Sequence, residues 1–104
     1  MDIEQYRKKI SSDGYIEGGS EAHLFMHGAA RSAQRVTAEI NAGCHTAEEH
    51  RALMSELVGY EVDEGFGLFP PIYSDFGRNI KLGRNVFINS GCCFQDQGGI
   101  ELGD

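Results

Sequence analysis

An apolar residue returns every six positions in the stretch FGRNIKLGRNVFINSGCCF, residues 76–94. The apolar positions are Phe76, Leu82, Ile88 and Phe94. Neither an α-helix nor an ordinary strand has this period, because helical side chains repeat every 3.6 residues and strand side chains alternate. A period of six is typical of a β-helix, in which three flat faces joined by three corners form one triangular coil of about 18 residues.

The first two units of the repeat also predict where the corners lie. In FGRNIK and LGRNVF, glycine follows the apolar residue directly, and asparagine comes three positions after the apolar residue. Glycine and asparagine adopt left-handed backbone more readily than other residues, so they suit a corner. We therefore expect Phe76, Leu82 and Ile88 on the three faces of one coil, with Phe94 stacked over Phe76 in the interior.

The rhythm breaks after Phe94 with the polar, glycine-rich sequence QDQGG. The aliphatic–glycine–polar pattern resumes at Leu102-Gly103-Asp104, eight rather than six residues after Phe94. A two-residue insertion at a corner explains this spacing. We expect the insertion to bulge outward, where it could contact a ligand, although a plain turn without a role has the same sequence pattern.

Residues 20–58 are expected to form a hairpin of two helices. Ser20 is the predicted N-cap of the first helix. The apolar stripe of this helix consists of Leu24, Ala29, Ala33, Val36 and Ile40. Thr46 and Glu49 have the spacing of a capping box at the start of the second helix, and Gly59 ends it. The buried face of the second helix consists of Leu53, Met54, Leu57 and Val58. Before residue 20, YRKKI could begin a short helix, whereas SSDGYIEGG has the composition of a loop.

Charge and composition argue against several classes of protein. The 104 residues carry 16 acidic and 9 basic side chains, a net charge of -7, which disfavours nucleic-acid binding. No apolar run is long enough to span a membrane, and the polar N-terminus does not resemble a secretory signal. We therefore expect a cytoplasmic protein. Cys44, Cys92 and Cys93 have the spacing of neither a disulfide framework nor a zinc site.

The tail FPPIYSDFGRNIKLGRNVFINSGCCFQDQGGIELGD resembles the first coils of the hexapeptide-repeat sugar O-acetyltransferases, most closely the maltose and galactoside O-acetyltransferases. The sequence TAEEHRALMSELVG resembles the N-terminal helical segment of the same enzymes, so the resemblance covers residues 20–104. It implies an α+β fold with a helical segment at residues 1–58. Residues 59–104 would begin a left-handed parallel β-helix that is truncated within a coil.

The resemblance also implies a chemistry. These enzymes transfer an acetyl group from acetyl-CoA, a co-substrate rather than a tightly bound cofactor, to a sugar hydroxyl. They work as homotrimers with the active site between two subunits, and a histidine acts as general base on the hydroxyl. Asn89 stands where the family has an asparagine that lines the acceptor site. Asp75 stands at a position facing the acceptor, where the galactoside enzyme has a serine.

Four further positions are candidates for acceptor binding by the same resemblance. Asp96 and Gln97 stand where the galactoside enzyme has two aspartates, the second of which contacts the sugar. Gln97 keeps a hydrogen-bonding oxygen but not the charge. Near the N-terminus, where the family often has an acidic residue that reaches the site, Glu17 or Glu21 could serve.

The catalytic histidine of the family follows the next coil, in a short HP context that would come after Asp104. All four histidines lie before the repeat, at His23, His27, His45 and His50. His23 and His27 have the i, i+4 spacing of metal ligands, but no third ligand accompanies them, and we predict no metal site. The 104 residues are therefore expected to be inactive alone.

Three alternatives remain at this stage. The chain could be a non-catalytic assembly fragment that associates through its helices and unfinished coils. A zinc-dependent, carbonic-anhydrase-like β-helix would need histidines on the coils, and residues 59–104 contain none. A small α+β domain with coincidental glycines would have to explain four apolar residues in register with two glycine and two asparagine repeats.

Overall fold

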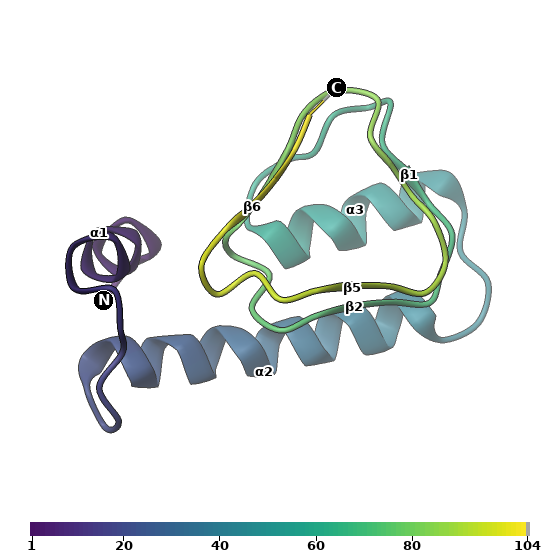
Figure 1. Ribbon diagram of the computed structural model, residues 1–104. Helices are drawn as coiled ribbons and strands as arrows, with labels where there is room; N and C mark the ends of the chain where they lie inside the picture. Colours follow the sequence, from purple (N-terminus) through teal and green to yellow (C-terminus); the bar gives the residue numbers. More distant parts are fainter. Residues whose placement is uncertain (104) are drawn as a thin grey trace.

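The structure is a computed structural model that describes residues 1–103, and it is α+β, with three helices followed by six short strands (Figure 1). The helices are α1 (Ile3–Asp13), α2 (Glu21–Asn41) and α3 (Ala47–Val58). The strands are β1 (Gly67–Leu68), β2 (Ile72–Ser74), β3 (Ile80–Leu82), β4 (Phe87–Ile88), β5 (Cys92–Phe94) and β6 (Ile100–Leu102). Asp104, the polar residue of the expected Leu102-Gly103-Asp104 pattern, lies outside the described residues.

The six strands form the three sides of a triangular coil, as the repeat predicts (Figure 1). β1 pairs with β4, β2 with β5 and β3 with β6, and every pair is parallel. Ile72 lies opposite Cys92, and Ile80 lies opposite Ile100. The chain therefore advances by 92 − 72 = 20 residues per coil rather than by the expected 18.

The expected stacking of Phe94 over Phe76 is wrong for this reason. Phe94 lies opposite Ser74. Phe76 follows the end of β2, within the five-residue corner 75–79, and its side chain leaves the coil interior to stack against Tyr6 of α1, with 4.9 Å between the ring centroids. The sequence QDQGG forms an equal five-residue corner, 95–99, directly above. The two-residue insertion therefore occurs in both coils.

The corners use left-handed backbone, as predicted, but the residue that supplies it differs. In the first unit it is Gly77 (φ 84°), and in the second it is Asn85 (φ 57°) rather than the glycine. Gly91 (φ 84°) serves at the next corner. One left-handed residue is enough to turn the chain, so glycine and asparagine need not both adopt this conformation in one unit.

Two helices cover the coil and close its apolar interior. α2 lies along β2, and α3 lies across the first coil beside β1 (Figure 1). The shared core consists of strand residues and helix residues that are almost fully buried, including Leu68, Ile72, Ile80, Ile88, Val36, Ile40, Met54 and Leu57. Burial of this apolar surface is the main force that holds helices and coil together.

The predicted ends of the helices are confirmed. The Ser20 hydroxyl accepts from the His23 N–H at 3.2 Å. Thr46 and Glu49 form a complete capping box, and Gly59 ends α3 in the left-handed conformation (φ 87°).

Two expectations about the helices are wrong. Leu24, expected in the buried stripe of α2, is 66% exposed because the first turns of this helix extend past the coil (Figure 1). α1 also continues through Ser11, Ser12 and Asp13, which were expected in a loop.

None of the helices within residues 1–103 is long and apolar enough to cross a bilayer.

Candidate functional site

The candidate acceptor residues lie at two different corners of the coil. Asn89 lies at the corner between β4 and β5, where the Gly91 N–H donates to the Pro71 carbonyl at 2.7 Å. Asp75 and Asp96 lie in the two stacked corners at the other end of the same face. Asp75 comes four positions after Pro71, and at about 3.3 Å per strand residue the two corners are about 13 Å apart.

Asn89 and Asp75 both present polar groups that the chain itself leaves available. Asn89 is exposed, and its Oδ1 accepts from the Ser90 N–H at 2.9 Å. Within residues 1–103, its Nδ2 makes no hydrogen bond. Asp75 is half-buried, and its backbone N–H donates to the Phe94 carbonyl at 2.9 Å, whereas its carboxylate makes no hydrogen bond to any residue that the structure describes. The amide can therefore donate to a ligand and the carboxylate can accept from one.

Asp96 differs from its expected position, because its side chain turns inward although the corner that carries it is otherwise largely exposed. Its side chain is completely buried. One carboxylate oxygen accepts from the Ser74 hydroxyl at 2.9 Å and from the Phe76 N–H at 3.0 Å, and the other accepts from the Asn79 N–H at 3.3 Å. Backbone donors at a buried corner have no strand partner, so an acceptor is required there. The Asp96 carboxylate supplies it and shapes the corner that carries Asp75.

Gln97, the next residue, joins this corner to α1. Its carbonyl accepts from the Tyr6 hydroxyl at 3.2 Å and from Asn79 Nδ2 at 3.4 Å. Burial raises the pKa of Tyr6, and the negative charge of Asp96 raises it further, so the phenol stays a neutral donor. Arg7 strengthens the attachment through its Nε, which donates to Asn79 Oδ1 at 3.0 Å.

Sequence reasoning missed Tyr6 and Arg7. Their signal is weak, because both belong to the polar stretch YRKKI, and their partners lie more than 70 residues further along the chain. Only the tertiary structure brings α1 to the corner.

A pocket of about 470 Å³ opens between the end of α1 and the corner at Gln97. Its lining is partly apolar, with Tyr6, Ile10 and Ile16 among the residues that contribute. Glu17 follows Ile16 directly and is exposed, whereas the exposed Glu21 lies in the first turn of α2. The volume and the mixed lining suit a small organic ligand.

The histidines lie on α2, on α3 or in the segment between these helices, and none lies on the coil. His23 and His27 form a pair with 2.9 Å between their Nε2 atoms. The Gly19 N–H donates to His23 Nδ1 at 3.0 Å, so His23 carries its proton on Nε2 and donates it to His27. A metal at His23 Nε2 would need that nitrogen unprotonated. Within residues 1–103, no three His, Cys, Asp or Glu side chains are grouped so as to hold a metal ion.

No family model matches the chain. Among curated proteins, it is 46% identical over 46 residues to a putative acetyltransferase of Staphylococcus haemolyticus (strain JCSC1435), which covers 44% of this chain and 23% of the relative. It is 26% identical over 94 residues to a putative acetyltransferase of Staphylococcus aureus (strain COL), which covers 90% of this chain and 46% of the relative. It is 36% identical over 59 residues to Nodulation protein L of Rhizobium leguminosarum bv. viciae, covering 57% and 30% of the two chains.

Among solved structures, the chain is similar to a hexapeptide-repeat-containing acetyltransferase of Vibrio cholerae O1 biovar eltor, solved in complex with acetyl coenzyme A. The TM-score is 0.75 at 28% identity, and the match covers 95% of this chain and 51% of the Vibrio chain. The chain thus spans about half or less of the length of these relatives. Together with the triangular coil, the comparisons support the hexapeptide-repeat acetyltransferases as the class of protein to which it is related.

Proposed function

We propose that this chain forms the acceptor side of an acetyl-CoA-dependent O-acetyltransferase that acts on a sugar hydroxyl. The observation that carries the proposal is the similarity of the whole coil and its covering helices to an acetyltransferase solved with acetyl-CoA. Residues 1–58 would then be the helical segment, arranged as a hairpin after α1, and residues 59–104 would begin a left-handed coil. Free Cys44, Cys92 and Cys93 fit a cytoplasmic location.

The acceptor chemistry is assigned to the polar groups at the two corners. The Nδ2 of Asn89 would donate to one sugar oxygen, and the carboxylate of Asp75 would accept from a sugar hydroxyl. Gln97 lines the 470 Å³ pocket, and its corner stacks on the corner that carries Asp75, so it could contact the same sugar. Glu17 and Glu21 would approach from the segment that follows α1. Asp96 would contribute by holding the corner in place.

The two corners belong to one acceptor site only if two protomers meet. A separation of about 13 Å along the face exceeds the distance between hydroxyl groups on one sugar ring. We therefore infer that Asn89 of one protomer faces Asp75 of its neighbour in a homotrimer. Closed cyclic assemblies repeat one such interface identically around the axis.

The general base is not assigned to this chain. His23, His27, His45 and His50 lie on α2, on α3 or between these helices, and none lies on the coil. A positioned base contributes about 10² to 10⁴ in rate. We therefore expect the 104 residues alone to transfer no measurable acetyl group from acetyl-CoA to maltose or a galactoside.

A chimera tests the proposed function. Residues 1–104 would replace the matching half of the Vibrio cholerae acetyltransferase, whose remaining coils supply the rest of the fold. We expect the chimera to bind acetyl-CoA and to acetylate at least one sugar in a panel of maltose, glucose and galactosides. The variant Asn89→Ala should lower this rate about tenfold or more, because a hydrogen bond to the reacting sugar is lost. A chimera that binds acetyl-CoA and acetylates no sugar would contradict the proposal.

A further inference from the structure

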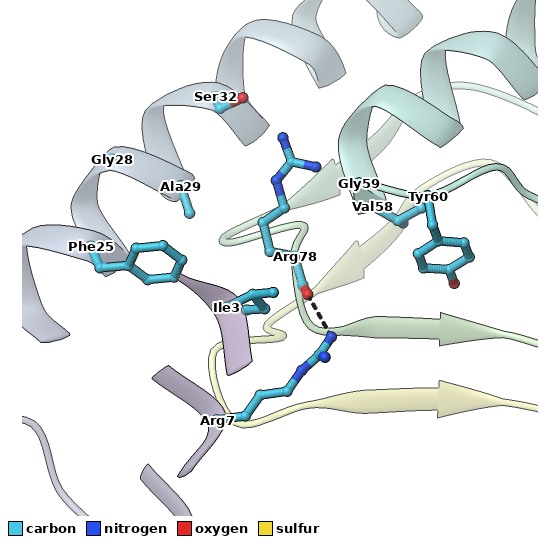
Figure 2. Close-up of a pocket in the computed structure, with 10 residues that line it drawn as sticks. All are labelled: Ile3, Arg7, Phe25, Gly28, Ala29, Ser32, Val58, Gly59, Tyr60 and Arg78. Carbon is cyan, nitrogen blue, oxygen red and sulfur yellow. Dashed lines mark hydrogen bonds between the residues drawn. The ribbon is translucent and has the colours of Figure 1, made fainter. Parts of the chain in front are cut away.

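The described residues also form a pocket that none of the candidate acceptor residues lines. It has a volume of about 670 Å³ and lies between α1, α2 and the C-terminal end of α3 (Figure 2). Its walls are apolar on the helix side, where Ile3, Phe25, Ala29 and Val58 contribute. We call it the Arg78 pocket, because this arginine projects between α2 and the end of α3.

The Arg78 pocket is cationic in an acidic chain. No carboxylate lines it, although the chain as a whole has a net charge of -7. Two arginines, Arg7 and Arg78, do line it. A guanidinium is always protonated, so the pocket keeps its positive charge at every physiological pH.

Only one of the two arginines is available to a ligand. Arg7 is already bonded to Asn79, to Glu4 and, through NH2, to the Arg78 carbonyl at 3.1 Å (Figure 2). The guanidinium of Arg78 makes no hydrogen bond or ion pair within residues 1–103. Figure 2 shows it directed away from Arg7, towards Ser32 on α2.

The end of α3 is shaped to hold Arg78 there. A Cβ atom at Gly59 would collide with NH1 of Arg78, and Gly59 also has a φ of 87°. Glycine therefore both ends the helix and leaves room for the guanidinium. The Tyr60 hydroxyl, on the same side, donates to the Ile80 carbonyl at 3.1 Å and accepts from the Leu82 N–H at 2.9 Å, which fixes the adjoining wall.

We propose that the Arg78 pocket binds a small organic monocarboxylate with an apolar body. The carboxylate forms a bidentate pair with the free guanidinium, the strongest type of hydrogen-bonded ion pair available to an arginine. The apolar body packs against Phe25, Ala29 and Val58. A single free guanidinium matches a single negative charge, and the volume is in the range typical of small-molecule sites. This proposal does not depend on the proposed acetyl transfer.

The test is a calorimetric titration of the 104-residue chain with 4-phenylbutyrate. The uncharged 4-phenylbutan-1-ol tests the need for the carboxylate, and inorganic phosphate tests the need for the apolar body. We expect saturable binding of 4-phenylbutyrate and at least about tenfold weaker binding of the other two probes. Absence of 4-phenylbutyrate binding, or equal binding of phosphate, would overturn the proposal.

Two variants and one control locate the site. Arg78→Gln keeps the length of the side chain but removes its charge, and it should weaken 4-phenylbutyrate binding at least about tenfold. Arg31→Gln removes an exposed charge on α2 that does not line the pocket, and its binding should match that of the unaltered chain. If Arg78→Gln binds 4-phenylbutyrate as tightly as the unaltered chain does, the guanidinium does not hold the carboxylate and the proposal is wrong.

A second pocket variant separates binding from folding. Gly28 lines the pocket within α2, and a Cβ atom added there would meet no other atom within 4 Å. Gly28→Leu should therefore fill the pocket while raising the helix propensity of this position. We expect an unchanged or higher melting temperature together with the loss of 4-phenylbutyrate binding. Undiminished binding by this variant would also contradict the proposal.

Discussion

At the scale of single residues, Asp96 links the fold to the candidate site. It is fully buried, yet within residues 1–103 it has no basic partner, and its carboxylate is satisfied by the three donors at Ser74, Phe76 and Asn79. The same corner carries Asp75, so the position of a candidate ligand-binding carboxylate depends on a buried one. Polar groups in such buried networks are costly when left without partners.

Asp96→Ala should destabilise the chain by about 2–4 kcal/mol, because buried N–H and O–H donors lose their acceptor. The free energy of unfolding from urea titration measures this change. Asp75→Ala is the matched control, and it should change the free energy of unfolding by less than about 0.5 kcal/mol, since the Asp75 side chain makes no hydrogen bond within residues 1–103. Equal effects of the two substitutions would show that Asp96 does not hold the corner.

His50 on α3 is a second buried polar residue, and its Nε2 has no hydrogen-bond partner among the described residues. Burial lowers the pKa of His50, and the neighbouring His45 lowers it further. The unfolded chain therefore takes up a proton on this side chain at a higher pH than the folded chain does. The contribution of His50 to the free energy of unfolding is therefore complete above about pH 6.5, and it is lost as the pH falls below that value.

Urea unfolding at pH 7.5 and pH 5.5 checks this prediction. We expect the free energy of unfolding to be lower at pH 5.5, and the decrease to become smaller in His50→Leu, which cannot take up a proton. His27→Gln removes an exposed histidine from α2 and should leave most of the decrease in place. If His50→Leu shows the full decrease, another group is responsible.

At the scale of elements, the start of α3 shows what a local pattern can predict. The Thr46 hydroxyl accepts from the Glu49 N–H at 3.1 Å, and the Glu49 carboxylate accepts from the Thr46 N–H at 2.7 Å. The bonds to Thr46 also lower the pKa of Glu49. Both partners lie within four residues of each other, so their spacing alone was sufficient to predict the geometry.

Thr46→Ala should cost about 1 kcal/mol, because an N-cap side chain is lost. Thr46→Ser keeps the hydroxyl and should retain most of the stability. Thermal unfolding followed by circular dichroism measures both variants. Equal melting temperatures for Thr46→Ala and the unaltered chain would show that the capping box contributes nothing to α3.

The coil shows where local pattern stops being sufficient. The period of six predicted a triangular parallel coil. The three parallel strand pairs, β1 with β4, β2 with β5 and β3 with β6, confirm it. It did not predict the 20-residue register, because Phe76 is apolar and in phase but belongs to a corner. An apolar side chain has the same sequence signature whether it enters the coil or packs on Tyr6 of α1. Only the position of α1 distinguishes the two.

The roles of the candidate site residues stay predictions. The resemblance selected Asn89 and Asp75, and the structure places both on corners with polar atoms available. The sequence did not show that Asp96 is buried, because an aspartate that binds backbone donors and one that faces solvent occur in the same polar, glycine-rich context. It also did not reveal the Arg78 pocket, whose lining comes from three helices and a corner.

At the scale of the whole molecule, the helices and the coil form one structure held by long-range contacts. α1 is attached through Tyr6 and Arg7, whose partners lie in the corners 75–79 and 95–99. Those are the corners that carry Asp75 and Gln97, whereas Asn89 lies at the far end of the face. In the proposed function, these two ends of the face meet only between protomers.

Mixed oligomers show whether Asn89 and Asp75 meet across a protomer interface. Chimeras that carry Asn89→Ala or Asp75→Ala would be purified separately, and each should be at least about tenfold impaired in sugar acetylation. The two would then be unfolded, mixed in equal amounts and refolded together. If each site takes Asn89 from one protomer and Asp75 from its neighbour, random mixing restores about a quarter of the sites. We predict recovery to about that fraction of the unaltered rate. A mixture no more active than the average of the two variants would show that both residues act within one protomer, and would contradict the account.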